Sequence, residues 1–295
     1  MNKPKTIGLI IKPKVPAAEE LAKKIITYVK ENKLSLILEE KSSKLISIDV
    51  DSLPADKLAT KADLIVSLGG DGTLISIARH STNPPPLMLG VNFGTLGFLT
   101  EIAPLEFFDV FKEALNANAK TGRRRMLSVT LKRDKKIVYQ TQAINDAVIQ
   151  KSADNKLIEL DVEVGGEDVF RIKSDGVIVS TPVGSTAYCL SAGGAIVHPS
   201  LSVMEITSIC THSLTFRPLV LPMDYMVKIR VPNHQGDILL MVDGQESIEI
   251  EPNDYVEITE SSNSVEFVRS PKRTYFEVLR TKLNWNINNH NSNVS

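Results

Sequence analysis

Short apolar runs alternate with amphipathic segments over the first 122 residues of the chain. Leu21, Ile25 and Val29 follow Pro16 at spacings of four residues in a charged background, which predicts a helix with one buried face. Strands that alternate with helices predict an α/β domain whose mostly parallel sheet is covered on both faces. The apolar runs that predict its strands are 6–11, 34–38, 64–68 and 86–91.

Two further helices are predicted by apolar residues at helical spacing. One precedes the polar stretch 116–122, and the other follows Pro271 and ends at Trp285. We expect the final helix to pack back onto the α/β domain and the polar tail 286–295 to be loose. The apolar positions are Leu105, Phe108, Phe111 and Leu115 in the first helix, and Tyr275, Leu279 and Leu283 in the second.

From residue 123 the pattern changes to paired strand-like runs. Two pairs of runs flank short turns at 133–136 and 165–166 and predict hairpins. The sequence therefore predicts a β-rich domain at 123–270, while 1–122 and 271–295 form a Rossmann-like α/β domain. The predicted strands of the β-rich domain are 126–132, 137–142, 157–164, 169–173, 176–180, 227–231, 238–242, 247–250 and 255–258.

Three consecutive arginines, Arg123 to Arg125, stand where the pattern changes. Such a cluster can clamp a phosphate, or it can form a solvated linker between two domains. The linker is the favoured interpretation, because a run of like charges is usually solvated.

The composition is that of an ordinary globular protein, with 42% apolar and 23% charged residues. The formal net charge of −1 gives no global reason for nucleic-acid binding, so an anionic ligand must meet local groups. No apolar run reaches the roughly 18 residues of a membrane helix, and Met1 to Lys5 lead directly into a strand pattern. Cys189 and Cys210 are too few for a disulfide framework or a thiolate metal site. We therefore expect a cytoplasmic protein without a membrane or nucleic-acid partner.

The most informative stretch is the glycine turn 69–73, Gly-Gly-Asp-Gly-Thr, which follows the apolar run 64–68. Glycines let the backbone approach a phosphate closely, and a following helix presents free N–H groups to it. An acid beside bound phosphate would repel it unless the acid acts on a proton or a metal ion. The turn therefore indicates a phosphate site with a functional carboxylate, although a plain polar turn has the same residues.

A second glycine-bearing loop, 92–98, follows the predicted strand 86–91. Ligands of parallel sheets sit beyond the carboxyl ends of the strands, which is where both loops fall. We therefore expect one ligand site near the two loops.

Another concentration of polar chemistry lies at 174–194 in the β-rich domain. This stretch combines Asp175 with several Ser, Thr and Gly residues and with Tyr188. Hydroxyls and backbone groups can hydrogen-bond a polar ligand while the tyrosine ring supplies a stacking face. A structural turn rich in glycine and serine is the alternative interpretation.

Asn145 and Asp146 interrupt an otherwise apolar strand-like run, 142–149. Two adjacent polar residues in such a run cost stability unless they are paired or used. An amide beside a carboxylate suits recognition of ribose hydroxyls or an adenine edge. A turn at the end of a strand would have the same residues.

Taken in chain order, these motifs resemble the bacterial NAD kinase family, and the resemblance covers nearly the whole chain. The glycine turn alone is shared with diacylglycerol, sphingosine and phosphofructokinase-type kinases. The long motif at 174–194 is the specific part. The matching stretches are 69–73, 92–100, 145–146, 174–194, 217–220, 243–245 and 275–285.

The resemblance implies transfer of the ATP γ-phosphoryl group to the 2′-hydroxyl of the adenosine ribose of NAD, giving NADP, with Mg²⁺ or another divalent ion. Asp71 is then the general base, and the site lies in the cleft between the domains. It also implies phosphate contacts from Gly69, Gly70, Gly72 and Thr73. The residues expected at the nucleotide ligands are Asp71, Gly72, Asn145, Asp146, Lys156, Lys173, Asp175, Val183, Thr186, Ala187, Tyr188, Cys189, Leu190, Ser191 and Gln245.

The sequence departs from the family pattern at two places, and two alternative functions remain open. Val183 stands where relatives often have Ser or Thr, and the pair 145–146 is Asn-Asp where many have Asn-Glu. A lipid kinase of the same superfamily would need an apolar channel, against which the hydroxyl-rich stretch 180–191 argues. A non-catalytic NAD sensor would not need Asp71. Family members are typically homo-oligomers, so we expect a tetramer or a dimer.

Overall fold

The computed structural model describes residues 3–46, 50–152, 156–232 and 236–285, which form two compact units. Unit 1 comprises the residues up to Ile77, Pro86–Gly122 and those from Glu266 on. Unit 2 comprises Ala78–Pro85 and Arg123–Val265. The short segment after the glycine-turn helix therefore belongs with the β-rich part of the chain. The tail 286–295 lies outside the described residues.

Unit 1 contains a parallel sheet in the strand order β5-β4-β1-β2-β3. The last residues of β17 (Tyr255–Val268) lie parallel beside β5. Every residue of β4 and β5 is buried, as expected for strands covered on both faces. The α/β prediction is therefore confirmed. The strands are β1 (Thr6–Ile11), β2 (Ser35–Glu39), β3 (Ser52–Leu53), β4 (Leu64–Leu68) and β5 (Leu87–Val91).

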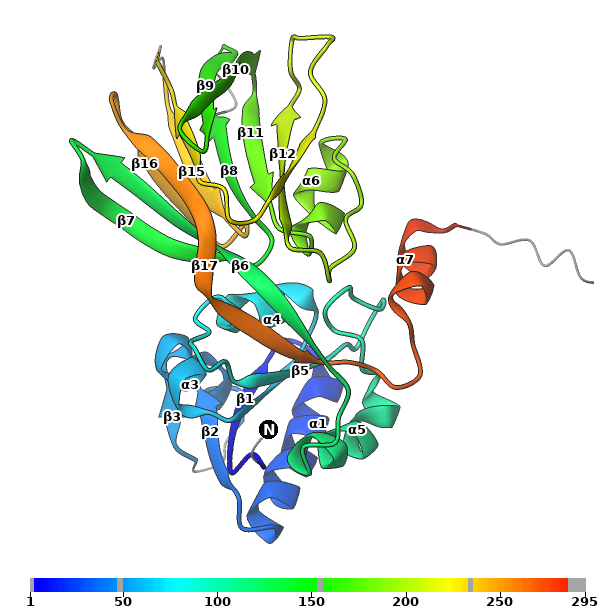
Figure 1. Cartoon of the computed structure of the whole chain (residues 1–295). Coiled ribbons are helices and arrows are strands. Elements are labelled where there is room, and N and C mark those ends of the chain that lie inside the picture. Colours follow the sequence, from blue (N-terminus) through cyan, green and yellow to red (C-terminus); the bar gives the residue numbers. More distant parts are fainter. Residues whose placement is uncertain (1–2, 47–49, 153–155, 233–235, 286–295) are drawn as a thin grey trace, which may run out of the picture. The chain divides into compact units, whose positions relative to one another are not determined.

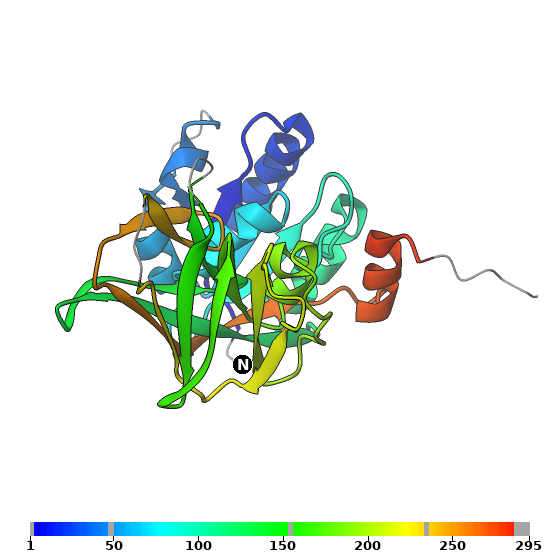
Figure 2. The ribbon, with the colours of Figure 1, turned by 90° about the horizontal axis from the view of Figure 1, so that it is seen from above.

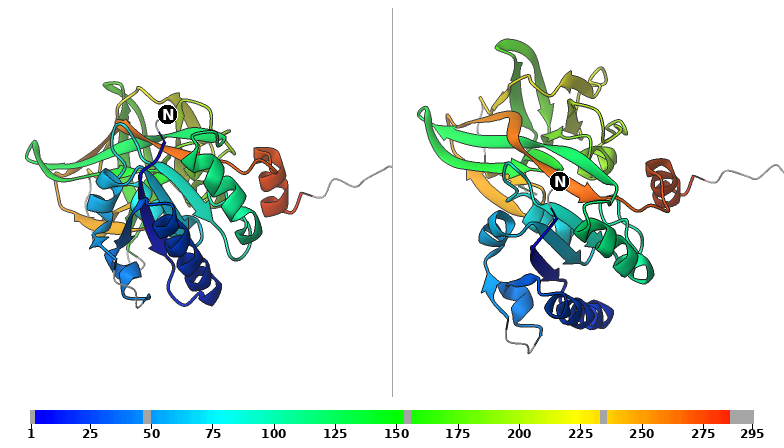
Figure 3. Two further views of the ribbon diagram at one scale, coloured as in Figure 1. Left: turned by 90° about the horizontal axis from the view of Figure 1, so that it is seen from below. Right: turned by 60° about the horizontal axis from the view of Figure 1, so that its bottom comes forward.

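Helices α1 (Pro16–Glu31) and α5 (Phe107–Leu115) lie side by side on one face of this sheet (Figures 1 and 3). Their apolar faces join the buried side chains of β1, β4 and β5 in one core. The predicted first helix is confirmed, with Leu21, Ile25 and Val29 all buried.

The other face of the sheet carries α3 (Ala55–Lys61) and α4 (Asp71–Ala78). A Cβ at Gly8 would lie 3.1 Å from Leu58 of α3, and one at Gly90 would lie 2.9 Å from Leu74 of α4. These two glycines therefore allow both helices to approach the strands closely. The short helix α2 (Glu40–Ser43) follows β2.

The predicted helix at 105–115 is confirmed, and Phe108, Phe111 and Leu115 pack in the core as expected, but the prediction for Leu105 is wrong. Leu105 is fully exposed, because it lies in the 3-10 turn η1 (Pro104–Glu106), which has a different helical phase from α5. The buried residues of α5 are Phe107, Val110, Phe111 and Ala114.

Unit 2 is a sandwich of two mainly antiparallel sheets. One has the order β13-β12-β11-β8-β15-β16, and the short helix α6 (Tyr188–Ser191) packs against it at β11 and β12 (Figure 2). The other contains β10-β9-β14-β17 together with the hairpin β6-β7. The strands are β6 (Thr121–Arg133), β7 (Lys136–Ala143), β8 (Asp146–Lys151), β9 (Ile158–Val164), β10 (Glu167–Ser174), β11 (Gly176–Ser180), β12 (Val203–Ile209), β13 (Leu219–Pro222), β14 (Val227–Arg230), β15 (Ile238–Val242) and β16 (Glu246–Ile250).

The core of unit 2 lies between these sheets. Alternate residues of β9 and β15 are buried, which is the period of two that predicted them. The two hairpins are confirmed, and Asp134 and Lys135 both have positive φ in the turn of the first. The β-rich prediction is therefore confirmed.

Two of the differences from the predicted strands have identifiable reasons. β12 was missed because buried polar residues, including Glu205 and Thr207, interrupt its apolar pattern. β17 continues far beyond the predicted end at 258 through the polar residues 260–264, because it pairs there with β6 rather than presenting an apolar face.

The arginine cluster is not a solvated linker. Arg123 to Arg125 lie in β6, and Arg124 is buried. Arg123 donates a hydrogen bond of 2.9 Å from Nε to Oγ of Ser264. The three arginines are therefore part of a paired strand, so the charge run did not predict the local structure.

The final helix is α7 (Tyr275–Leu283), and it belongs to unit 1. A capping box of Thr274 and Glu277 begins it, and Asn284 ends it in the left-handed conformation. Among the described residues, no helix combines the length and the apolar character required to span a bilayer.

Candidate active site

The glycine turn connects β4 to α4 in unit 1. A Cβ at Gly69 would lie 2.6 Å from Oγ1 of Thr73, so this glycine is needed for the turn to close on the helix. A Cβ at Gly70 or Gly72 would meet no atom within 4 Å. The space over these two glycines is therefore open to a ligand.

The N-terminus of α4 lies at Asp71, directly after this turn. The first N–H groups of any helix have no acceptor within the helix, and the helix dipole makes this end positive. The open glycines and the helix end together have the geometry that suits an anion, which is what the predicted phosphate site requires.

The carboxylate of Asp71 is held by the loop that follows β5. Oδ2 accepts a hydrogen bond of 2.8 Å from the N–H of Phe98, while Oδ1 accepts one of 3.2 Å from the N–H of Leu99. Oδ1 also accepts bonds from Thr100, of 2.9 Å from its N–H and 2.7 Å from its hydroxyl. Four donors therefore fix the orientation of the carboxylate before any ligand binds.

Gly97 makes room for this arrangement. A Cβ at this position would overlap Oδ1 of Asp71 and Oγ1 of Thr100. Asn92 organises the same loop, because its side chain accepts from the N–H of Gly94 at 2.8 Å and donates to Oγ1 of Thr100 at 3.2 Å. The two glycine-bearing loops, which follow β4 and β5, therefore meet at Asp71.

A pocket of about 430 Å³ opens over these residues. Its lining includes the side chains of Lys12 and Lys282, which sequence reasoning missed. Lys12 follows the carboxyl end of β1, which was the available signal, whereas Lys282 lies in α7 and no motif indicated it. Both cations favour an anionic ligand. The pocket is lined by Lys12, Val15, Gly69, Gly70, Asp71, Asn92, Phe93, Gly94, Thr95, Gly97 and Lys282.

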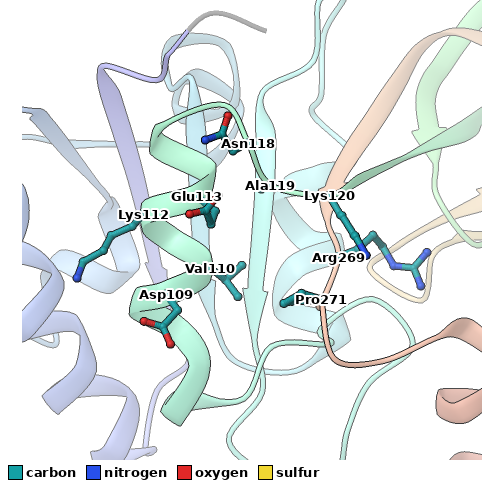
Figure 4. A pocket seen from close by; sticks show the side chains of 9 residues that line it. All are labelled: Asp109, Val110, Lys112, Glu113, Asn118, Ala119, Lys120, Arg269 and Pro271. Atoms are coloured by element: carbon teal, nitrogen blue, oxygen red, sulfur yellow. The ribbon is translucent and has the colours of Figure 1, made fainter.

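A second pocket in unit 1, of about 350 Å³, contains none of the predicted site residues. Val110 of α5 points towards Pro271 across it, while Lys112 points away (Figure 4). We assign it no part in the reaction.

In unit 2, Asp243 clamps the backbone of the Asn145-Asp146 pair. Its carboxylate accepts hydrogen bonds from the N–H groups of Ile144, Asn145 and Asp146 at 2.9, 2.7 and 3.1 Å. Burial raises the pKa of Asp243, and these N–H groups oppose the rise. Asp243 belongs to the matching stretch 243–245, but its hydrogen bonds to the Asn145-Asp146 backbone were not predicted. The reason is that 98 residues separate it from Asn145.

The end of β11 holds the same pair from the other side. The N–H of Thr181 donates to the carbonyl of Asn145 at 2.8 Å, and its hydroxyl donates to the carbonyl of Ile144. A Cβ at Gly184 would overlap the carbonyl oxygen of Asn145. The Asn145-Asp146 turn and the hydroxyl-rich stretch are therefore packed together, as a single polar site requires.

The acidic groups of this site affect one another. Burial, followed by the charge of Asp243, raises the pKa of Asp146 to about 7. Burial and the nearby Cys210, Asp175 and Asp146 raise the pKa of the Tyr188 phenol. Asp175 also lies 3.4 Å from the ammonium group of Lys151. Asp146, Asp175 and Tyr188 are thus brought into one neighbourhood.

The remaining predicted residues differ in how exposed their side chains are. Lys156, Lys173 and Gln245 are exposed, and Gln245 lies in the turn between β15 and β16. The side chain of Cys189 is fully buried against Thr207, and burial raises its pKa to about 12, so only its backbone is available to a ligand. The others lie in or beside η2 (Gly184–Thr186) and α6: Val183 is buried, Thr186, Ala187 and Leu190 are partly exposed, and Ser191 is exposed.

No cluster of three or more His, Cys, Asp or Glu side chains able to hold a metal ion occurs within the described ranges. A divalent ion bound here would therefore take most of its ligands from nucleotide phosphates and water, as Mg²⁺ commonly does.

An anion pocket at a glycine turn and helix N-terminus, with an oriented carboxylate in it, defines a phosphate-handling enzyme of the α/β type. Family models assign the chain more narrowly: ATP-NAD kinase N-terminal domain matches residues 7–119, and ATP-NAD kinase C-terminal domain matches residues 144–270. The chain belongs to the ATP-NAD kinase family, and it is an ATP-dependent NAD kinase.

Individual relatives support the same family assignment. The NAD kinase of Geotalea daltonii is 39% identical over 281 residues, which cover 95% of this chain and 99% of that protein. The NAD kinase of Geobacter metallireducens is 37% identical over the same shares. Yeast NADH kinase, solved with NADH, has a TM-score of 0.89 at 28% identity and covers 100% of this chain and 91% of its own. An Archaeoglobus fulgidus NAD kinase, solved with ATP, has a TM-score of 0.74 at 25% identity, with coverages of 94% and 99%.

Proposed function

We propose that this enzyme transfers the γ-phosphoryl group of ATP to the 2′-hydroxyl of the adenosine ribose of NAD, giving NADP. The observation that carries the proposal is the oriented carboxylate of Asp71 in the lysine-bearing pocket at the N-terminus of α4. Family membership supplies the two substrates, and the pocket supplies groups that suit phosphates and a proton acceptor.

Asp71 acts as the general base in this proposal. Among the described residues, Oδ1 accepts three hydrogen bonds and Oδ2 accepts one, so Oδ2 retains a lone pair for a substrate hydroxyl. A carboxylate held in this way can orient the ribose hydroxyl and accept its proton as the oxygen attacks phosphorus. The N–H groups at Gly70 and Gly72 and the ammonium groups of Lys12 and Lys282 would neutralise phosphate charge.

The NAD site is proposed to consist of the Asn145-Asp146 pair, Asp175 and the segment Val183–Ser191, with Lys156, Lys173 and Gln245 at its margin. Support comes from the packing of the pair against Thr181 and from its neighbours Asp175 and Tyr188. Carboxylate and amide groups suit ribose hydroxyls, and the 40% exposed Tyr188 can stack on a base. The reaction requires that the ribose hydroxyl of NAD bound to these residues reaches the carboxylate of Asp71.

Mg²⁺ or a related divalent ion, when bound with ATP, would neutralise the charge of the transferred phosphoryl group. The resemblance to bacterial NAD kinases also carries the proposals that the enzyme works in the cytoplasm and forms a homo-oligomer, a tetramer or a dimer.

The direct test incubates purified protein with ATP, Mg²⁺ and NAD and identifies the product by mass spectrometry and by phosphorus NMR. We expect NADP with the new phosphate on the 2′-oxygen of the adenosine ribose. NADH in place of NAD tests the acceptor, and diacylglycerol or sphingosine tests the lipid-kinase alternative. Binding of NAD without any turnover would support the sensor alternative and contradict the proposal.

A further inference from the structure

Arg79 is a buried arginine outside the catalytic pocket. It directly follows α4, belongs to unit 2, and has a side chain only 3% exposed. A guanidinium group is always charged, and burying it is costly unless it is paired. Its partners therefore indicate what the burial achieves.

The partners of Arg79 lie on the strands around the Asn145-Asp146 pair. Its Nη2 donates a hydrogen bond of 2.7 Å to Oγ1 of Thr141 in β7 and lies 2.8 Å from Oε2 of Glu246 in β16. The Tyr139 hydroxyl donates to the same oxygen of Glu246. Although burial opposes it, the bond from Tyr139 and the charge of Arg79 lower the pKa of Glu246.

The backbone around Arg79 is fastened to unit 2 as well. Nε2 of Gln142 donates to the carbonyl of Arg79 at 3.3 Å, and Oγ of Ser81 donates to the carbonyl of Ser264 at 2.9 Å. The main chain that carries the guanidinium group is therefore also tied to unit 2.

Glu246 lies at the end of the turn that carries Asp243. Asp243 and Gly244 both have positive φ, and the N–H of Gln245 donates to the carbonyl of Val242 at 2.9 Å. Arg79 thus holds the turn at Glu246. Its charge also acts on Asp243 itself, where it opposes the rise in pKa that burial causes.

Asp243 accepts hydrogen bonds from three backbone N–H groups at once, and an ionised carboxylate makes stronger bonds of this kind than a neutral carboxyl group does. Burial disfavours the ionised state of Asp243, and so does the nearby carboxylate of Asp146. Arg79 and the three N–H groups favour that state, and His80 helps to lower the pKa of Glu246.

We infer that Arg79 is a positioning residue for NAD recognition: it fixes the β15–β16 turn, and through Asp243 that turn fixes the Asn145-Asp146 backbone. This inference rests on the proposed NAD site, but it assigns Arg79 no contact with NAD. The lysine-bearing pocket at the glycine turn, where we propose that phosphates bind, is lined by none of these residues, so we expect the loss of Arg79 to affect NAD and not ATP.

The test measures NAD binding by calorimetry, and the KM values for NAD and ATP from NADP formation, in wild type and Arg79→Met. We expect the Kd for NAD to rise about tenfold or more and the KM for ATP to stay within about twofold. Arg79→Lys retains the charge without the fork of donors and should recover part of the loss. Arg171→Met, which removes an exposed ion pair with Asp161, is the matched control and should leave both values unchanged.

Glu246→Gln covers the case in which Arg79→Met does not fold, because Glu246 is 44% exposed and glutamine keeps its shape. It should raise the Kd for NAD about threefold or more while its thermal unfolding stays close to wild type. NAD affinity equal to wild type in folded Arg79→Met or in Glu246→Gln would overturn the inference, even if the melting temperature fell. Failure of the wild type to bind NAD would instead overturn the proposed function.

Discussion

The backbone N–H of Asn145 donates a hydrogen bond of 2.7 Å to Oδ1 of Asp243, which lies 98 residues further along the chain. Through this bond and those from Ile144 and Asp146, a buried carboxylate at the end of β15 shapes the start of β8. A polar turn that would otherwise bend freely becomes a fixed part of the site.

Asp243→Ala should lower the free energy of unfolding by about 3 kcal/mol or more, because it leaves buried backbone N–H groups without an acceptor. It should also weaken NAD binding in whatever fraction stays folded. Urea unfolding and calorimetry measure the two effects. Asp224→Ala, at an exposed turn position, is the control and should change neither. A stability within about 0.5 kcal/mol of wild type would show that the clamp is not structural.

Gly97→Ala should lower kcat by about 100-fold or more with a much smaller effect on the melting temperature. The added methyl group would overlap Oδ1 of Asp71 and force the carboxylate out of its hydrogen bonds. Gly94→Ala is the matched control in the same loop, since its Cβ would lie 3.8 Å from Oδ1 of Asn92. Steady-state rates of NADP formation decide the point, and equal rates in the two variants would argue against an oriented Asp71.

The pKa of Asp146, raised to about 7 from the ordinary 3.8, makes stability depend on pH. Between these values the folded protein binds a proton that the unfolded chain does not, so the contribution of Asp146 to stability is full below the lower value. It is lost as pH rises to about 7, by up to about 1.4 kcal/mol per pH unit.

Asp146→Asn should therefore be more stable than wild type at pH 8, and the difference should shrink as pH falls towards 4. Urea unfolding of both proteins at several pH values measures it, and comparing the pair removes the titration of other groups. Parallel stability curves would mean that the Asp146 carboxyl titrates in its ordinary range. The gain in stability should be accompanied by weaker NAD binding, as is common for strained functional sites.

The fold was largely predictable because most of its helices and strands have apolar residues at a regular local spacing. The strands β4 and β5 are buried on both faces and therefore read as continuous apolar runs. In β9 and β15 every second residue is buried, as in a strand with one face on a sandwich core. Three of the failures have one cause in common: β12, the second half of β17 and the arginine segment of β6 form strands although they carry polar side chains.

The candidate site also contains some residues that local motifs indicated and others that they did not. The glycine motif indicated Asp71 and the backbone of Gly70 and Gly72 as candidate site groups. A phosphate can approach the backbone closely only where glycines stand at fixed spacing. Lys282, Arg79 and the clamping role of Asp243 depend on residues far apart in the chain. No local pattern distinguishes these side chains from ordinary surface or core positions.

The central claim is that Asp71 accepts the proton of the ribose 2′-hydroxyl, and the most direct measurement is kcat for NADP formation by Asp71→Asn, with NAD and ATP affinities measured in parallel. Asp63→Asn is the control, because Asp63 directly precedes β4 and its carboxylate, among the described residues, accepts hydrogen bonds from the exposed N–H groups of Lys5 and Thr6. We predict that kcat falls by at least about 100-fold in Asp71→Asn, with NAD affinity changed by less than about fivefold, and that Asp63→Asn matches wild type. A kcat for Asp71→Asn within about threefold of wild type would contradict the account.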